Sequence, residues 1–209
     1  MPFRALMVVA AALLVAGCGS SKSAPPSAQS PTTNGAMTAS AKTTTSSAPP
    51  SALQAEANSA ATGDIPDNQV FISFRDRAAG YSLKYPEGWA QWGAGARVTF
   101  RDKNNIVRVV TASGSLPTAA SISADLGRLP GAHVQSRPGT LTINGAPAFR
   151  VVYTTQSAPN AVTGKRVTLV VDRYYLAHAG KEAIVDLGTP VGVDNVDAYR
   201  LMIESFRWR

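Results

Sequence analysis

Apolar and polar side chains alternate along several short segments that follow residue 66. Residues 70–75, VFISFR, show this period of two, and so do residues 97–102, RVTFRD. In GYSLKYP, Tyr81, Leu83 and Tyr85 fall on one side, and polar residues fall on the other. Such alternation is typical of a strand with one buried face. The pattern therefore predicts strands at 70–75, 81–85 and 97–102, with their aromatic side chains facing inward.

Turn-forming residues separate the predicted strands. Pro86-Glu87-Gly88 supplies a turn, because Pro fixes φ at its first corner and Gly permits a positive φ later; Trp89 then re-enters the sheet. Asn144-Gly145 is the dipeptide that favours tight hairpins most strongly. Further strands are predicted at 106–112, 140–143, 148–155, 166–175 and 182–187.

Two segments have the spacing of helices. Residues 118–129 carry Ile122, Leu126 and Leu129 on one side, and Pro130-Gly131 ends the segment. Near the end of the chain a second apolar stripe follows Asp194, which we expect to cap the helix. Its members are Val196, Tyr199, Met202, Ile203 and Phe206. Consecutive hairpins with two helices predict an α+β domain in which helices cover an antiparallel β-sheet.

The first 65 residues have a different composition. Residues 5–16 are apolar, are too few to span a bilayer, and stand just before Gly17-Cys18. Val15-Ala16-Gly17-Cys18 resembles the bacterial lipobox, in which the cysteine is acylated and cleavage occurs just before it. The alternative is an ordinary signal peptide whose cysteine is incidental. The expected organisation is a lipoprotein signal peptide at 1–17, a disordered Ser/Thr/Pro/Ala-rich linker at 18–65 and a globular domain at 66–209.

Charge narrows the range of partners. Residues 66–209 hold 17 Lys and Arg against 11 Asp and Glu, a net charge of +6. This excess favours contact with anionic lipid head groups or polyanionic envelope polymers. Nucleic acid is not expected, because the basic residues are scattered and no recognition motif accompanies them.

Several stretches of the domain resemble a known fold. The resemblance is to the PsbP-like α/β/α sandwich, the fold of the photosystem II extrinsic protein PsbP and of many bacterial lipoproteins. The order of signal, linker and late hairpins also resembles mycobacterial LpqN-type lipoproteins. The resemblance implies a non-enzymatic accessory or binding role. It is carried by GYSLKYPEGW, APAFRVVY, LGRLPG, RYYLAHAGKEAIVDL and MIESFRW.

Catalytic and metal-binding motifs are missing from the sequence. His133 and His178 are the only histidines, and we expect both to be solvated loop residues. The spacings of zinc sites and the Gly-x-Ser-x-Gly nucleophile elbow do not occur. Gly93-Ala94-Gly95 begins like a dinucleotide loop, but a strand follows it where a helix is required. We therefore predict a protein that is not an enzyme, with no catalytic, cofactor-binding or metal-ligating residues.

Two sets of residues remain as candidate binding features. Arg97, Arg101 and Arg108 form a possible basic patch on one sheet face, for which an ordinary solvated face is the alternative. The aromatic residues of the opening hairpin form a possible ligand groove, for which core packing is the favoured alternative. These residues are Tyr81, Tyr85, Trp89 and Trp92, and Trp92 is the one that alternation leaves unexplained.

The sequence thus supports two hypotheses of function at the extracytoplasmic face of the cell membrane. In both, acylated Cys18 holds the chain on the bilayer. The first is a scaffold or assembly role towards envelope proteins. The second is a carrier or sensor of an envelope lipid or glycan, which requires a pocket.

Overall fold

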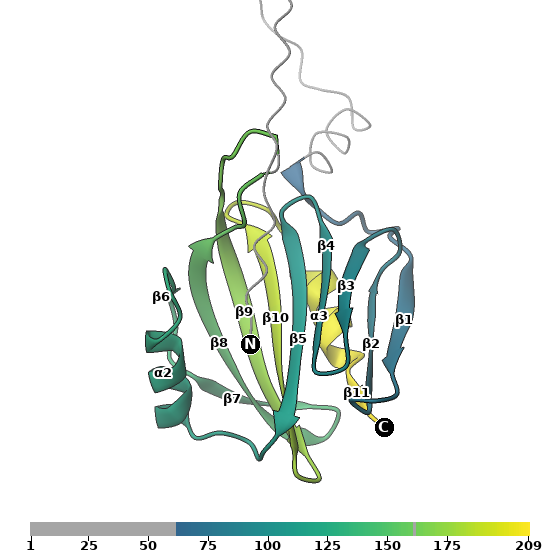
Figure 1. Ribbon diagram of the computed structural model, residues 1–209, viewed down its shortest axis with the longest axis vertical. Coiled ribbons are helices and arrows are strands. Elements are labelled where there is room, and N and C mark those ends of the chain that lie inside the picture. The colour runs from purple at the N-terminus through teal and green to yellow at the C-terminus, as the bar shows by residue number, and fades with distance from the viewer. Residues whose placement is uncertain (1–61, 161) are drawn as a thin grey trace, which may run out of the picture. The chain divides into compact units, whose positions relative to one another are not determined.

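The computed structural model describes residues 62–160 and 162–209 (Figure 1). The signal peptide, Cys18 and nearly all of the linker lie outside these residues. The strands are β1 Phe71–Asp76, β2 Tyr81–Pro86, β3 Ala90–Ala94, β4 Arg97–Asp102, β5 Asn105–Ser113, β6 His133–Val134, β7 Gly139–Ile143, β8 Ala146–Gln156, β9 Thr168–His178, β10 Lys181–Pro190 and β11 Arg207–Trp208. The helices are α2 Ala119–Gly127 and α3 Val196–Glu204.

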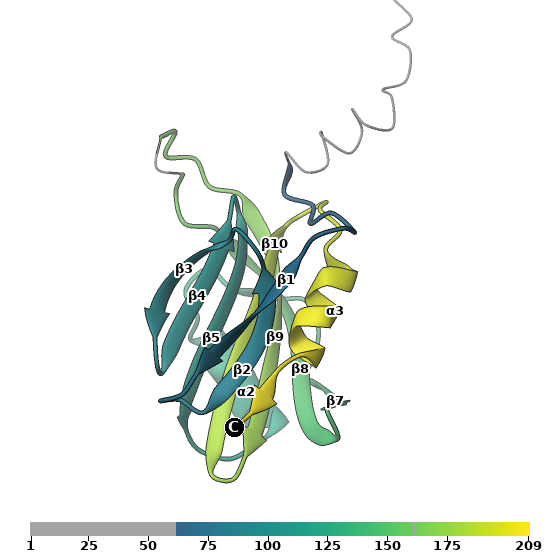
Figure 2. The same ribbon diagram turned by 90° about the vertical axis from the view of Figure 1, so that its right-hand side faces the viewer.

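The strands form two antiparallel sheets. The large sheet has the order β3-β4-β5-β10-β9-β8-β6, and β7 pairs with β8 beside this path. The small sheet has the order β1-β2-β11. Figure 2 shows the small sheet beside α3. All of these pairings join strands that run in opposite directions, as the predicted series of hairpins requires.

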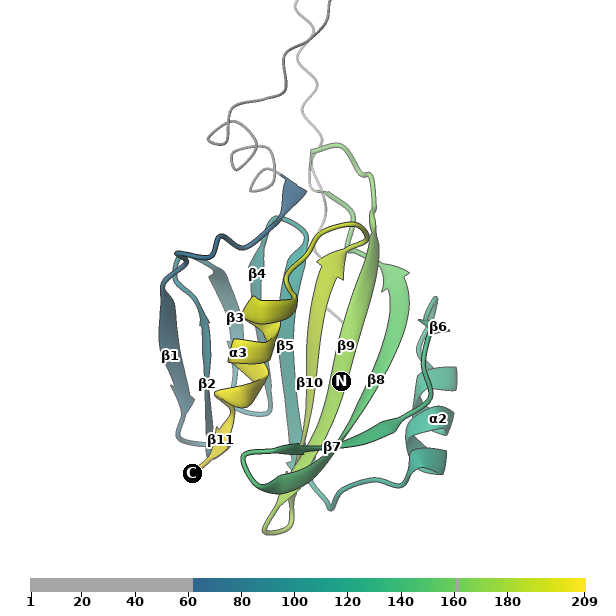
Figure 3. The same cartoon turned by 180° about the vertical axis from the view of Figure 1, so that it is seen from behind.

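The large sheet is covered on both faces. Helix α3 lies in front of it in Figure 3 and behind it in Figure 1. Tyr199, Met202 and Ile203 of α3 join a buried cluster with residues of both sheets. On the other face, Ile122 and Leu126 of α2 join a second buried cluster. This arrangement confirms the predicted α+β class, an antiparallel β-sheet covered by helices.

The aromatic residues of the opening hairpin lie mostly in the first cluster. Tyr81 is fully buried, and its ring stacks on Phe206 at a centroid distance of 5.5 Å. Tyr85 stacks on Phe100 at 4.1 Å. Trp89 is 8% exposed, which confirms that it belongs to the core. Packing of aromatic rings in these geometries adds to the stabilisation from their burial.

The tight turns agree with their sequence. Asn144 and Gly145 both have positive φ, 53° and 80°, the combination that a two-residue hairpin turn demands. Strands β7 and β8 flank this turn with Ile143 opposite Ala146. The hairpin predicted from the Asn-Gly dipeptide is therefore confirmed.

The start of the last helix differs from the prediction. The capping position is Asn195 rather than Asp194, although the Asp194 carboxylate accepts a hydrogen bond from Val196 N. Asn195 is buried, and its amide donates to Gly63 O and Thr189 Oγ1, which fixes this residue at the junction. Val196 is 68% exposed and does not belong to the buried stripe. It stands at the first position of the helix.

The sequence pattern does not predict the two shortest strands. Strands β6 and β11 each contain two residues, which is too short for any alternation to be detected. Both form by pairing with a longer strand, β6 with β8 and β11 with β2. His133 accordingly lies in a strand instead of a loop, with its side chain exposed.

Candidate functional site

The face of the large sheet that α2 covers is called the α2 face here, and cross-strand register orders its side chains in rows. One row runs across β4, β5, β10, β9 and β8 through Thr99, Arg108, Asp186, Arg173 and Val151. Residues directly opposite each other in antiparallel strands point to the same face, about 4.5–5.5 Å apart. The register therefore places two arginines on either side of one aspartate in the middle of the sheet.

These three residues form a buried ion-pair network. The Asp186 carboxylate, which is 3% exposed, accepts from Arg173 Nε at 2.7 Å and Nη2 at 3.0 Å. It also accepts from Arg108 Nε at 3.0 Å and Nη2 at 2.5 Å. Two guanidinium groups thus share the one carboxylate of Asp186. Such bidentate geometry is typical of the strongest protein ion pairs.

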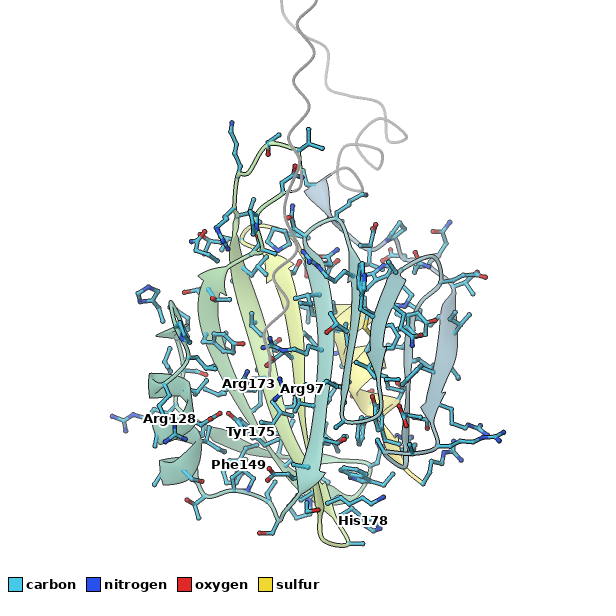
Figure 4. All side chains as sticks on the ribbon, viewed as in Figure 1. Arg97, Arg128, Phe149, Arg173, Tyr175 and His178 are labelled. Carbon is cyan, nitrogen blue, oxygen red and sulfur yellow. The ribbon has the colours of Figure 1, made fainter. Side chains whose placement is uncertain are left out.

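Helix α2 is connected to this network. Asp125 Oδ2 accepts from Arg173 Nη1 at 3.3 Å and from the Tyr175 hydroxyl at 3.4 Å. The Arg173 guanidinium also lies 5.3 Å from the centroid of the Tyr153 ring, within range of a cation–π contact. Figure 4 shows Arg173 and Tyr175 on this face, with Arg128 on the outer side of α2. Electrostatic contacts as well as apolar packing therefore hold α2 on the sheet.

Three groups in and around the network, Tyr153, Arg173 and Tyr175, have shifted pKa values. Burial raises the pKa of Tyr175 to about 12 and also raises the pKa of Tyr153. Burial by itself lowers the pKa of Arg173, but the hydrogen bond and the charge of Asp186, together with smaller contributions from Tyr153 and Tyr175, more than offset this, and the pKa is raised. The tyrosines stay neutral and the arginine stays charged, so none of the three is suited to general acid–base chemistry at neutral pH.

A cavity of about 350 Å³ opens beside this network. Ile106 and Val171 line it, and both side chains pack against Gly188. A side chain at position 188 would clash with them, because its Cβ would lie 2.8 Å from Ile106 Cγ2. The loop after α2 and the end of β8 form the walls. The lining residues include Leu129, Pro130, Ala132, Tyr153, Thr155, Ser157, Ala158 and Leu169.

Arginine side chains give the cavity a positive character. Arg101 and Arg108 line it together with Asp186. Arg108 is engaged with Asp186, but its side chain is still 43% exposed. Arg101 has no ion pair or side-chain hydrogen bond among residues 62–160 and 162–209. An apolar cavity with a free guanidinium at its side can take an apolar group that carries a negative charge.

The structure brings together part of the predicted basic patch. Arg101 and Arg108 both line the cavity. Arg97 lies on the same face, opposite Val110, one row further from the cavity. Figure 4 shows Arg97 over this face in the region of Arg173.

The predicted aromatic groove is divided between the two faces of the large sheet. Tyr81 and Tyr85 pack in the cluster between the sheets. Trp92 is opposite Thr99 and is therefore on the α2 face, where its side chain is 53% exposed. His178, at the β9–β10 hairpin, is exposed and stands apart from the cavity (Figure 4).

Sequence reasoning missed the centre of the site. Asp186 and Arg173 were not singled out, although each is a charged residue inside an otherwise apolar strand, VVDRYYL and AIVDLG. A charge in a buried strand requires a partner, and this was the available signal. In the described residues, no group of three or more His, Cys, Asp or Glu is placed to hold a metal ion. Within the same residues, neither helix is long and apolar enough to cross a membrane.

Comparison with known proteins shows that the fold of this chain is similar to that of several solved structures. No family model matches the sequence, and no curated protein matches it significantly. CyanoP, the PsbP of the cyanobacterium Synechocystis, shares 16% identity over 70% of this chain and 98% of its own, with a TM-score of 0.47. LpqN, involved in cell envelope biogenesis of Mycobacterium tuberculosis, shares 14% identity over 67% of this chain and 91% of its own, with a TM-score of 0.39.

A third solved structure is a protein of Bacteroides thetaiotaomicron. It shares 13% identity over 66% of this chain, with a TM-score of 0.44, and this chain spans 48% of that protein. The chain is thus similar to the PsbP-like and LpqN-type structures that its sequence resembles.

Proposed function

We propose that this chain is a non-catalytic lipoprotein of the cell envelope whose domain, residues 66–209, binds an amphiphilic envelope ligand in the α2-face cavity. The observation that supports this proposal is the cavity of about 350 Å³ beside Arg101 and Arg108. Of the two functional hypotheses, the carrier or sensor is the one that needs such a cavity. We therefore place it ahead of the scaffold role.

The dimensions and lining favour a modest ligand. Small-molecule pockets are typically about 300–1,000 Å³, so this cavity is near the lower limit. It suits one acyl chain or one ring better than a complete multi-chain lipid. Its apolar walls would take the hydrocarbon part, and Arg101 would contact a carboxylate, a phosphate or a hydroxyl-bearing head.

The groups around the cavity support binding without catalysis. The Ser157 hydroxyl donates to Ala158 O at 2.8 Å and accepts from Val167 N at 3.1 Å. A serine engaged in this way has no adjacent base to activate it as a nucleophile. Tyr153 remains neutral because burial raises its pKa. We therefore infer that the ligand is held and released unchanged.

The test is native mass spectrometry of the full-length protein, purified in mild detergent from its own envelope. We expect a stoichiometric bound amphiphile. The Ala132→Phe variant fills the cavity and should lose the ligand. Ala120→Phe makes the same substitution at an exposed position of α2 outside the cavity lining, and should keep it. Absence of ligand from the wild type, or its retention in Ala132→Phe, would refute the proposal.

A second candidate is the scaffold role, and Trp92 favours it. A tryptophan that is 53% exposed on the edge strand β3, on the same face as Arg97 and Arg101, has the composition of a protein-binding hot spot. A photo-crosslinking amino acid at position 92 in cells should then capture one reproducible protein. The same amino acid at exposed Arg137 is the control. A crosslinked protein with no co-purifying ligand would place the scaffold role first.

A further inference from the structure

A second hollow lies on the side of the molecule that carries α3. It has a volume of about 600 Å³ and runs between the outer face of the small sheet and the exposed side of α3; we call it the α3 groove. The lining from the sheet includes Ser73, Arg75, Ser82, Lys84, Arg207 and Arg209. The lining from the helix includes Asp197, Arg200, Leu201 and Glu204, with Ser205 just after it. It is separate from the α2-face cavity, with which it shares no lining residue.

The register of the small sheet concentrates positive charge at this groove. Arg75 of β1 and Arg207 of β11 both pair with Ser82 of β2, so the two arginines flank one serine on the same face. Arg209 Nε donates to Ser82 Oγ at 3.2 Å, which brings a third guanidinium to the same point. Lys84 lies on the same face, two residues along β2.

Few of these charges are compensated within the described residues. The lining has five cationic side chains and two carboxylates. One of these carboxylates, Asp197, pairs with Arg200. Arg75 and the Lys84 ammonium have no side-chain hydrogen bond or ion pair in residues 62–160 and 162–209. Like charges held close together repel one another, and a multiply charged anion bound between them would relieve that repulsion.

The lining also restricts the class of ligand. Ser82 and Ser205 provide hydroxyl groups, and none of the described residues that line the groove is aromatic, so charges and hydroxyl groups would hold a ligand there instead of ring stacking. Three guanidinium groups gather at Ser82, and Lys84 on β2 and Arg200 on α3 spread the positive charge beyond that point along the hollow. Spread charges fit repeated anionic groups better than a single phosphate ion.

We infer that the α3 groove binds a segment of a linear polyanionic glycan. The choice of a glycan over another polyanion rests on the envelope location in the proposed function. The groove itself is a separate site from the α2-face cavity. A polymer strand is favoured over an anionic bilayer because the buried Ser82 stands at the base of a recess that a flat membrane surface does not enter. Guanidinium groups can bind each carboxylate through paired hydrogen bonds.

The test measures binding of fluorescent polygalacturonate to the full-length protein in detergent, with neutral dextran and inorganic phosphate as comparison ligands. The Arg75→Gln/Lys84→Gln variant removes two exposed, unpartnered charges from the groove. Arg137→Gln/Lys165→Gln removes two exposed charges elsewhere and is the matched control. We expect affinity for polygalacturonate to fall roughly tenfold in the groove variant at low ionic strength, and less than about twofold in the control.

The other outcomes each decide against the inference. Equal losses in both variants would show that net charge alone attracts the polymer. Binding of dextran or phosphate as tight as that of polygalacturonate would overturn the ligand class. Tighter binding to mixed micelles containing phosphatidylglycerol, lost in the same groove variant, would identify a membrane-facing surface instead. The Ala132→Phe variant should bind polygalacturonate normally, so failure of the cavity proposal and failure of this one are distinguishable.

Discussion

The residue that organises the α2 face is Asp186. It is buried, and it accepts hydrogen bonds from Arg108 on one neighbouring strand and Arg173 on the other. The Arg173 side chain is only 5% exposed. Its ion pair with Asp186 compensates for much of the cost of burying its charge. A buried ion pair contributes little net stability compared with apolar packing, but breaking one leaves an uncompensated charge.

We predict that Asp186→Ala lowers the free energy of unfolding by about 3–5 kcal/mol, because the buried Arg173 loses its two shorter hydrogen bonds and keeps only the longer contact with Asp125. Asp172→Ala is the matched control. Its partner Arg150 is 47% exposed, and we expect a loss of at most about 1 kcal/mol. Urea denaturation of the two variants measures both values. Similar losses of stability in the two variants would show that the buried ion pair of Asp186 contributes no more than the exposed one of Asp172.

Tyr81 presents the opposite case, a buried hydroxyl without a hydrogen-bond partner among the described residues. Burial raises the pKa of Tyr81 and of Tyr199, so both hydroxyls stay protonated. Tyr199 is satisfied, since its hydroxyl donates to Gly188 O at 2.6 Å.

Tyr81→Phe should therefore leave the stability unchanged or raise it by about 1 kcal/mol, because an unsatisfied buried hydroxyl costs about 1–3 kcal/mol. The ring keeps its stacking on Phe206. Tyr199→Phe should lower the stability by about 1 kcal/mol, since a made hydrogen bond is lost. Thermal melting of both variants is the measurement, and the reverse order of stabilities would disprove the assignment.

At the scale of elements, α2 is the short helix that precedes the loop in the cavity wall. It has nine residues and buries Ile122 and Leu126. Helices this short are marginal without tertiary contacts. Thr118 caps it, with its Oγ1 accepting from Ser121 N at 3.2 Å, and Asp125 ties it to Arg173.

Loss of the cap should loosen α2 selectively. We predict that Thr118→Ala destabilises the helix by about 1 kcal/mol. Amide hydrogen exchange in residues 119–127 should accelerate while exchange in β9 and β10 stays unchanged. Ser123→Ala, which removes an exposed hydroxyl within the helix, is the control and should have little effect. Uniform acceleration across the sheet would mean that α2 opens together with the whole domain.

At the scale of the whole molecule, the proposed anchor determines where the domain works. We predict that Cys18 is acylated, because it ends the short apolar segment where a lipobox cysteine belongs. Cys18→Ala should abolish labelling by a clickable fatty acid, and should leave uncleaved precursor or release the protein from the membrane fraction. Ser20→Ala, two residues away, should label normally. Equal labelling of Cys18→Ala would disprove the anchor.

The two proposed binding sites lie on different sides of the domain. The α2-face cavity is apolar with arginines at its wall, whereas the α3 groove is polar and strongly cationic. A tethered protein of this kind would hold an amphiphile on one face while its other face contacts a polyanionic surface. The net charge of +6 on residues 66–209 fits both roles.

The sequence by itself determined the longer strands, the two helices and most of the core. Alternation in β2 and β4, the Asn144-Gly145 turn and the spacing of Ile122 and Leu126 are local signals, because the period of a strand or a helix is set by the backbone alone. They were sufficient to predict the inward aromatic residues and the α+β class. They also gave the expectation of an anchor at Cys18, which depends on covalent processing and not on folding.

Tertiary structure decided which residues meet. Arg108, Arg173 and Asp186 come from three strands, and the register of β5, β10 and β9 alone makes them neighbours. The same is true of Arg75 and Arg207, which are 132 positions apart in the chain and flank Ser82 through two strand pairings. Alternation tells which face a side chain takes, but register between distant strands depends on how the whole core packs. For that reason the sequence contained the charges of both sites without indicating that they would gather there.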